Sequence, residues 1–65
     1  MRTEINRLRK ESGLSQQQLA DKLGVSRQTV VSLEKERYVA SLQLAYKISK
    51  LFNRPIEEIF HMEEE

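Results

Sequence analysis

The segment LSQQQLADKLGVSRQTV, residues 14–30, decides the fold because it contains two helix starts in quick succession. Ser15 followed by Gln18 is the pattern of a capping box, in which each side chain satisfies a free backbone N–H of the other residue. A second start follows at Ser26, and the first helix ends at Gly24. Two helices joined by so short a turn cannot lie antiparallel, so they cross at a steep angle. The spacing therefore predicts a helix-turn-helix.

Three more helices are expected around this segment. The first runs from about Thr3 to Ser12, and Gly13 stops it. Ser41 caps a later helix that Asn53 ends in the left-handed conformation, and Pro55 begins a short last helix. The apolar residues that recur at helical spacing or staple a helix start are Ile5, Leu8, Leu14, Leu19, Ala20, Leu23, Val25, Val30, Leu33, Leu44, Ala45, Ile48, Leu51, Phe52, Ile56, Ile59 and Phe60. We expect an all-α fold of five helices and leave open a short strand near His61–Met62.

The composition excludes several classes of protein. The 65 residues give one small domain, residues 1–65, and contain no Cys and a single His61, which cannot build a metal site alone. No Gly-rich phosphate loop and no Ser-His-Asp set can be assembled, so we expect no catalytic site, cofactor, metal or small-molecule ligand. No apolar run is long enough to span a membrane or to act as a signal peptide. A soluble, cytoplasmic, nucleoid-associated domain is expected.

Charge is distributed unevenly along the chain. Residues 1–55 contain all 11 Lys and Arg and five of the ten acidic residues, for a net charge of +6, and residues 56–65 contain the other five acids. A basic body with an acidic tail, about residues 61–65, is typical of a protein that binds a polyanion. The same charges also keep a small domain soluble, and charge alone does not separate the two interpretations.

The second helix of the pair presents a polar face on the side opposite its apolar residues. On a helical wheel Val30, Leu33 and the stem of Glu34 share one arc and face the body of the domain. Arginine pairs bidentately with guanine and glutamine with adenine in the major groove, serine bonds several base edges, and an apolar side chain contacts the thymine methyl. The base-reading residues predicted from the outward arc are Arg27, Gln28, Ser32 and Val31.

Contacts with DNA phosphates are expected from neighbouring segments. The start of the first helix of the pair offers free backbone N–H groups and polar side chains to an anion. Basic and aromatic residues follow the reading helix, where a flanking DNA backbone would pass. The backbone-contacting residues predicted are Ser15, Gln16, Gln17, Thr29, Lys35, Arg37 and Tyr38. Tyr38 fits equally well as an aromatic residue at the edge of the core.

These motifs resemble the Cro and phage-repressor type of helix-turn-helix, the XRE family, over about residues 5–60. The resemblance rests on LSQQQLA at 14–20, LGVSRQTV at 23–30 and LE at 33–34. Tyr38, SLQLA at 41–45 and PIEEIF at 55–60 support it. The compact chain is similar to the stand-alone members of the family, of the cytolysin-operon repressor type.

The resemblance implies a lambda-repressor-like domain that binds a palindromic double-stranded DNA operator as a homodimer. Regulation of transcription in a bacterial or phage-like setting is the expected function, with a repressor favoured and an activator left open. By position, Arg27, Gln28 and Ser32 match base-contacting sites, and Gln16, Thr29, Lys35 and Arg37 match backbone-contacting sites. Arg9 and Glu34 match a partly buried ion pair that ties the first helix to the reading helix.

The chain departs from the family pattern in the loop after the reading helix. The family often has Asn-Gly after the residue corresponding to Glu34, whereas this chain has Lys35-Glu36. Glu36 is thus expected at a turn position that favours Gly, at some cost in strain. Its negative charge either weakens DNA binding or orients the loop. The common Pro before the Ser41 cap is Ala40 here.

Two points stay open from the sequence. Candidate dimer contacts, where exposed, are Val39, Phe52, Phe60 and Met62. A competing function is a protein-interaction module, such as an antitoxin that grips a toxin and binds DNA only secondarily. An enzyme is disfavoured because no catalytic site can be found. Steep loss of affinity with rising salt would mark the DNA binder.

Overall fold

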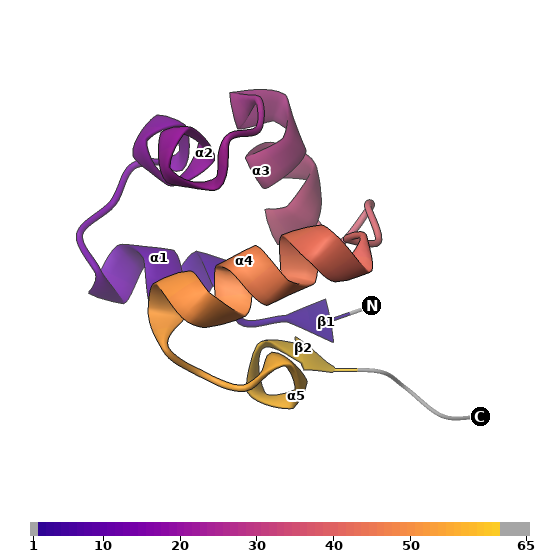
Figure 1. Ribbon diagram of the computed structural model, residues 1–65. Coiled ribbons are helices and arrows are strands. Elements are labelled where there is room, and N and C mark those ends of the chain that lie inside the picture. Colours follow the sequence, from indigo (N-terminus) through magenta and orange to yellow (C-terminus); the bar gives the residue numbers. More distant parts are fainter. Residues whose placement is uncertain (1, 62–65) are drawn as a thin grey trace.

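Five helices and two short strands make up residues 2–61, the part of the chain that the computed structural model describes (Figure 1). The elements are β1 (Arg2–Thr3), α1 (Ile5–Glu11), α2 (Gln16–Leu23), α3 (Arg27–Glu34), α4 (Leu42–Phe52), α5 (Ile56–Ile59) and β2 (Phe60–His61). The predicted all-α fold is confirmed, with a minimal two-stranded sheet added to it. Within residues 2–61, no helix combines the length and apolar character needed to cross a membrane.

The helix-turn-helix is built by the local contacts that its sequence predicts. The Ser15 hydroxyl accepts from the Gln18 N–H at 3.0 Å, and the Gln18 side chain accepts from the Ser15 N–H at 2.8 Å, which completes the capping box of α2. Gly24 ends α2 in the left-handed conformation, with φ of 72°. Ser26 then caps α3 by accepting from the Thr29 N–H at 3.2 Å. The chain thus turns between two helices over very few residues.

The second half of the chain is also defined by its caps. Ser41 caps α4 by accepting from the Leu44 N–H at 3.1 Å. Asn53 ends α4 in the left-handed conformation, with φ of 54°, as the sequence predicts. Pro55 lies just before α5 as its N-cap residue rather than inside the helix.

The core is formed by side chains from all five helices and from β2. Ile5, Leu19, Val30, Leu33, Ile48 and Ile59 are fully buried, and the remaining buried apolar residues are Leu8, Ala20, Leu23, Leu44, Ala45 and Phe60. Full burial of one such Leu or Ile stabilises the fold by about 1.5–3 kcal/mol. Leu51 matches the helical spacing but stays partly exposed at the edge of the core.

The two ends of the described chain pair with each other. Arg2 lies opposite His61 and Thr3 opposite Phe60 in an antiparallel pair. The helix expected from about Thr3 is therefore wrong at its start, because Thr3 belongs to β1 and α1 begins only at Ile5. β2 lies one residue earlier than the strand left open near His61–Met62. Met62 and the rest of the acidic tail lie outside the described residues.

One nearly buried carboxylate joins α1 to the end of α3. Glu34 accepts from Arg9 Nε at 2.6 Å and from Arg9 Nη2 at 3.2 Å. The Glu34 side chain is 5% exposed and the Arg9 side chain 12% exposed. Asn6 donates to the same carboxylate at 2.8 Å. Burial raises the pKa of Glu34, but hydrogen bonds from Arg9, Asn6 and Gln16 outweigh it and hold this pKa below its ordinary value. The ionised form of Glu34 is therefore part of the native fold.

We predict that Glu34→Gln lowers the free energy of unfolding at neutral pH by about 2–3 kcal/mol, somewhat less than for a fully buried pair, because Arg9 loses its partner. The pKa of Glu34 is lower in the folded state than its ordinary value of 4.5. At pH values between the folded-state pKa and 4.5, the unfolded state therefore binds more protons than the folded state. This stabilisation is complete above 4.5 and is lost as pH falls through the folded-state pKa. Thermal unfolding followed by circular dichroism from about pH 7 to about pH 3 should show a shallower decline for the variant. Parallel declines in the two proteins would contradict the assignment.

Candidate nucleic-acid interface

α3 is held in the domain by one side and leaves the other side free. Val30 and Leu33 are fully buried, whereas Arg27 and Gln28 are exposed at the start of the helix. Val31 and Ser32, also predicted to read bases, are half-buried. Figure 1 shows α3 beside α2, with the first turn of α3 at the end of this helix that lies farthest from α4. The four predicted base-reading residues therefore differ in exposure. Arg27 and Gln28 in the first turn are open to solvent, and Val31 and Ser32 in the next turn are partly covered.

The start of α2 supplies free backbone donors next to α3. The N–H groups of Gln16 and Gln17 have no intrahelical acceptor, because they belong to the first turn of the helix. The Gln17 side chain is exposed and donates to Asp21 at 2.9 Å. Gln16 is half-buried, and its amide nitrogen lies 3.4 Å from the Glu34 carboxylate. The helix start thus keeps an anion-binding geometry, while the Gln16 side chain leans toward the buried ion pair.

The hydroxyl groups predicted to contact phosphates already have structural partners. Ser15 uses both its hydroxyl oxygen and its N–H in the capping box. The Thr29 hydroxyl lies 3.0 Å from that of Ser26 at the start of α3. These contacts give Ser15 and Thr29 a role in shaping the two helix starts, independent of any DNA.

The loop after α3 carries the remaining predicted phosphate contacts. Lys35 and Arg37 are exposed, and Tyr38 is 44% exposed, which places it at the surface rather than in the core. Between the two basic residues Glu36 adopts the left-handed conformation, with φ of 62°, as expected for a position that favours Gly. The Glu36 carboxylate accepts from the Thr3 N–H at 3.0 Å.

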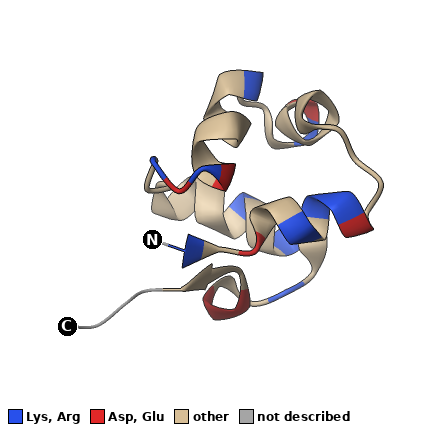
Figure 2. Cartoon of the chain, turned by 180° about the vertical axis from the view of Figure 1, so that it is seen from behind, with Lys and Arg blue, Asp and Glu red and all other residues tan. Residues whose placement is uncertain are grey.

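Positive charge on this side of the molecule is not neutralised by ion pairs. Elsewhere Arg7 pairs with Glu4 and Glu11, and Arg54 with Glu58. By contrast, Arg27, Lys35 and Arg37 form no salt bridge with any of residues 2–61. Figure 2 shows Lys and Arg at the start of α3 and in the loop that follows it. These three cations beside α3 are therefore free to meet a polyanion, and so are Lys22, Lys47 and Lys50, which also form no salt bridge within residues 2–61.

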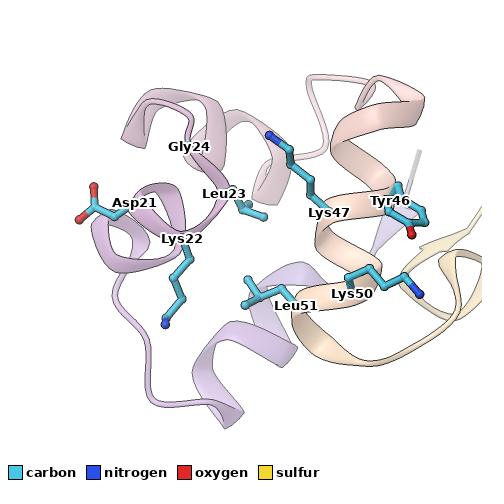
Figure 3. Close-up of a pocket in the computed structure, with 8 residues that line it drawn as sticks. All are labelled: Asp21, Lys22, Leu23, Gly24, Tyr46, Lys47, Lys50 and Leu51. Carbon is cyan, nitrogen blue, oxygen red and sulfur yellow. The ribbon is translucent and has the colours of Figure 1, made fainter.

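A groove of about 570 Å³ between α2 and α4 brings together basic residues that sequence reasoning missed. Lys22 of α2 and Lys47 of α4 line it together with Leu51, and their side chains run in different directions, whereas Asp21 points away from α4 (Figure 3). Lys50 extends along the other side of α4, with its Nζ 5.3 Å from the centre of the Tyr46 ring. No cap or motif marks these lysines in the sequence, because only the crossing of two helices brings them together. These lysines lie away from the outward side of α3, so their substitution serves as a control for the cations beside α3.

A second, apolar groove of about 430 Å³ lies where the loop, α4 and α5 meet. Leu42, 81% exposed, and Val39, 66% exposed, stand beside a floor that includes Phe60. Of the candidate dimer contacts, Val39 is thus exposed, whereas Phe60 is buried and Phe52 is half-buried against the core. Met62 lies outside the described residues. Sequence reasoning missed Leu42, the most exposed large apolar side chain among residues 2–61.

Comparison with known proteins places this geometry in context. The family described as helix-turn-helix matches residues 5–59. An uncharacterized HTH-type transcriptional regulator of Archaeoglobus fulgidus is 49% identical over 65 residues, covering 100% of this chain and 93% of the relative. A regulator described in the same words in Methanothermobacter thermautotrophicus is 50% identical over 66 residues, covering 100% and 96%. One in Bacillus subtilis is 46% identical over 65 residues, covering 100% and 98%. Relatives thus occur in archaea as well as in bacteria.

The capping role of Ser15 predicts a loss of stability that can be measured without DNA. Ser15→Ala should lower the free energy of unfolding by about 1 kcal/mol, because an N-cap is lost. Gln17→Ala leaves the cap intact, so its stability should change by less than about 0.5 kcal/mol. Urea unfolding of both variants measures this difference. Equal losses of stability in the two variants would show that the Ser15 cap does not stabilise α2 measurably.

Proposed function

The chain belongs to the helix-turn-helix family, and on that basis we propose that it is a sequence-specific regulator of transcription that reads duplex DNA. The observation that carries the proposal is the position of α3. Its apolar side is fully buried through Val30 and Leu33, while Arg27 and Gln28 stand exposed at its first turn. A helix held in this way can enter the major groove without disturbing the core, and its exposed side chains suit guanine and adenine.

Phosphate contacts would hold the reading helix in register. The free N–H groups at the start of α2 suit one phosphate, and Lys35 and Arg37 suit the backbone beyond the other end of α3. Contacts on both sides of the reading helix fix its orientation but carry no sequence information. In this arrangement Arg27 and Gln28 supply the specificity, and Val31 and Ser32 add contacts where the groove closes over the helix.

We further propose that the protein acts as a homodimer through the apolar groove. Leu42 projects beside a groove lined by Val39, Ala45 and Phe60, so each copy offers both an apolar projection and a recess. Such a surface can pair with itself about a two-fold axis. The groove begins in the loop that directly follows α3, so the two reading helices would flank the axis. A palindromic operator with half-sites about one helical turn apart matches this symmetry.

Repression is the regulatory outcome that we propose. A dimer bound to an operator hinders other proteins from using the same DNA, and this requires only the reading helices and the dimer contact. In this proposal α3 supplies the first and the apolar groove supplies the second. Activation would in addition require a productive contact with the transcription machinery.

Selection from a random duplex library, followed by anisotropy titrations across a salt series, tests the proposal as a whole. The expected result is an enriched palindrome with half-sites about ten base pairs apart and a steep loss of affinity with salt. Enrichment of a single, non-repeated half-site would refute the dimer alone. Weak binding without any enriched sequence would refute sequence-specific reading and favour a protein-interaction module.

Two substitutions separate base reading from phosphate binding. Arg27→Ala should cost about 1–3 kcal/mol on the preferred sequence and relax the choice of one base pair. Lys35→Ala should weaken binding to all sequences alike and reduce the salt slope by about one. Lys50→Ala, which removes the same charge from α4, is the matched control and should change both quantities little. Equal losses on selected and random DNA for both test variants would contradict the assigned roles.

The dimer contact is tested by Leu42→Glu. A buried charge on each side of the two-fold axis should dissociate the dimer at concentrations where the unmodified protein is dimeric, because unpaired charges are costly to bury. Sedimentation equilibrium measures the change. The control Lys47→Glu places a carboxylate on α4 beside the other groove and should leave the dimer intact. A Leu42→Glu protein that remains dimeric would rule out this surface.

A further inference from the structure

The loop that follows α3 is attached to the terminal strands through Glu36. Its carboxylate accepts from the Thr3 N–H at 3.0 Å, across 33 positions of sequence. This contact offsets an unfavourable backbone, because Glu36 has φ of 62°, a region that residues other than Gly rarely adopt. A glycine would relieve the strain but would provide no carboxylate.

The geometry of the terminal sheet explains why Thr3 has a donor to give. In an antiparallel pair, residues alternate between those that bond the partner strand and those whose N–H points outward. The neighbouring Glu4 N–H donates to Ile59 O at 2.8 Å, toward the other end of the chain, whereas the Thr3 N–H points to Glu36. An outer edge of β1 that would otherwise meet only water is thus capped by the loop after α3.

The same loop also borders the terminal region further along. Val39 and Ala40 line the apolar groove together with Phe60 of β2. Phe60 in turn lies opposite Thr3 in the sheet. Lys35 and Arg37 therefore flank the residue that attaches the loop to this small sheet, and the sheet borders the proposed dimer surface.

We propose that Glu36 is a positioning residue that fixes the phosphate-contacting loop to β1 and so sets the angle between the reading helix and the dimer surface. The inference rests on the proposed function and deepens it, because that angle determines the spacing of half-sites that a dimer accepts. Glu36 does not touch DNA in this scheme. Its negative charge lies between two cations and lowers the affinity for all DNA, and the tether makes the dimer selective for one spacing.

A double-mutant cycle separates the tether from the charge. Glu36→Ala removes both, Thr3→Pro removes the donor and keeps the charge, and Glu36→Gln removes the charge and keeps an oxygen acceptor. Each variant is titrated with the selected palindrome, with palindromes one base pair longer and shorter, and with a single half-site. Glu58→Ala, which removes an exposed carboxylate on α5, is the charge control.

Glu36→Ala and Thr3→Pro should each reduce the preference for the selected spacing about three- to tenfold, and the double variant should lose no more than either, as for residues in direct contact. Glu36→Gln should keep most of the preference while binding every DNA more tightly at low salt. Unchanged spacing preference in both Glu36→Ala and Thr3→Pro would overturn the proposal and leave Glu36 acting by charge alone.

Amide hydrogen exchange provides a readout that does not require DNA. The Thr3 N–H should exchange several-fold faster in Glu36→Ala than in the unmodified protein, and Glu58→Ala should leave its rate unchanged. Equal exchange rates in Glu36→Ala and the unmodified protein would also overturn the proposal, even if Thr3→Pro failed to fold. Failure of the unmodified protein to select any DNA would refute the proposed function, whereas the exchange rates would still decide whether the tether exists.

Discussion

The carboxylate of Glu34 is the point on which the orientation of the reading helix depends. It lies at the last residue of α3, is nearly buried, and receives donors from Arg9, Asn6 and Gln16. Arg9 also donates to the Leu14 carbonyl at 2.8 Å, which ties the connection between α1 and α2 to the same cluster. A charge that is shielded from solvent to this extent is stable only while its hydrogen-bonding partners stay in position. The three helices that form the first half of the domain are therefore locked together by one polar cluster.

The distribution of the other charges follows from this arrangement. Arg7 of α1 pairs with Glu4 and Glu11, and Arg54, which lies between α4 and α5, pairs with Glu58. Exposed pairs of this kind contribute little to stability, but they neutralise charge locally. Among residues 2–61, Arg27, Lys35 and Arg37 have no ion pair beside α3, and Lys22, Lys47 and Lys50 have none beside α2 and α4. Internal pairing thus leaves the positive charge beside α3 without a counter-charge, but it does not confine the excess charge to that side.

The family resemblance implied the ion pair of Arg9 with Glu34, but the parts of the fold that the residues themselves predict are those set by contacts three or four residues apart. Ser15, Ser26 and Ser41 cap helices through a backbone N–H three positions later, and each contact can be read directly from the chain. The outward placement of Arg27 and Gln28 followed from the same helical period. The terminal sheet was only partly predicted, because β1 depends on a partner strand almost the full chain away. The donor Asn6, the exposed Leu42 and the tether from Glu36 escaped prediction for the same reason: each gains its meaning from a residue or surface that folding brings near.

The predominance of short-range caps has a kinetic consequence. Helical domains whose contacts are mostly local fold in microseconds to milliseconds, since little loop entropy is lost before the contacts form. Among residues 2–61, the ion pair at Glu34, the contact between Thr3 and Glu36 and the pairing of β1 with β2 close long loops, and each involves few residues. Folding therefore adds no appreciable delay after synthesis. Synthesis of the 65 residues itself takes seconds, at roughly 5–20 residues per second, and is the slower step.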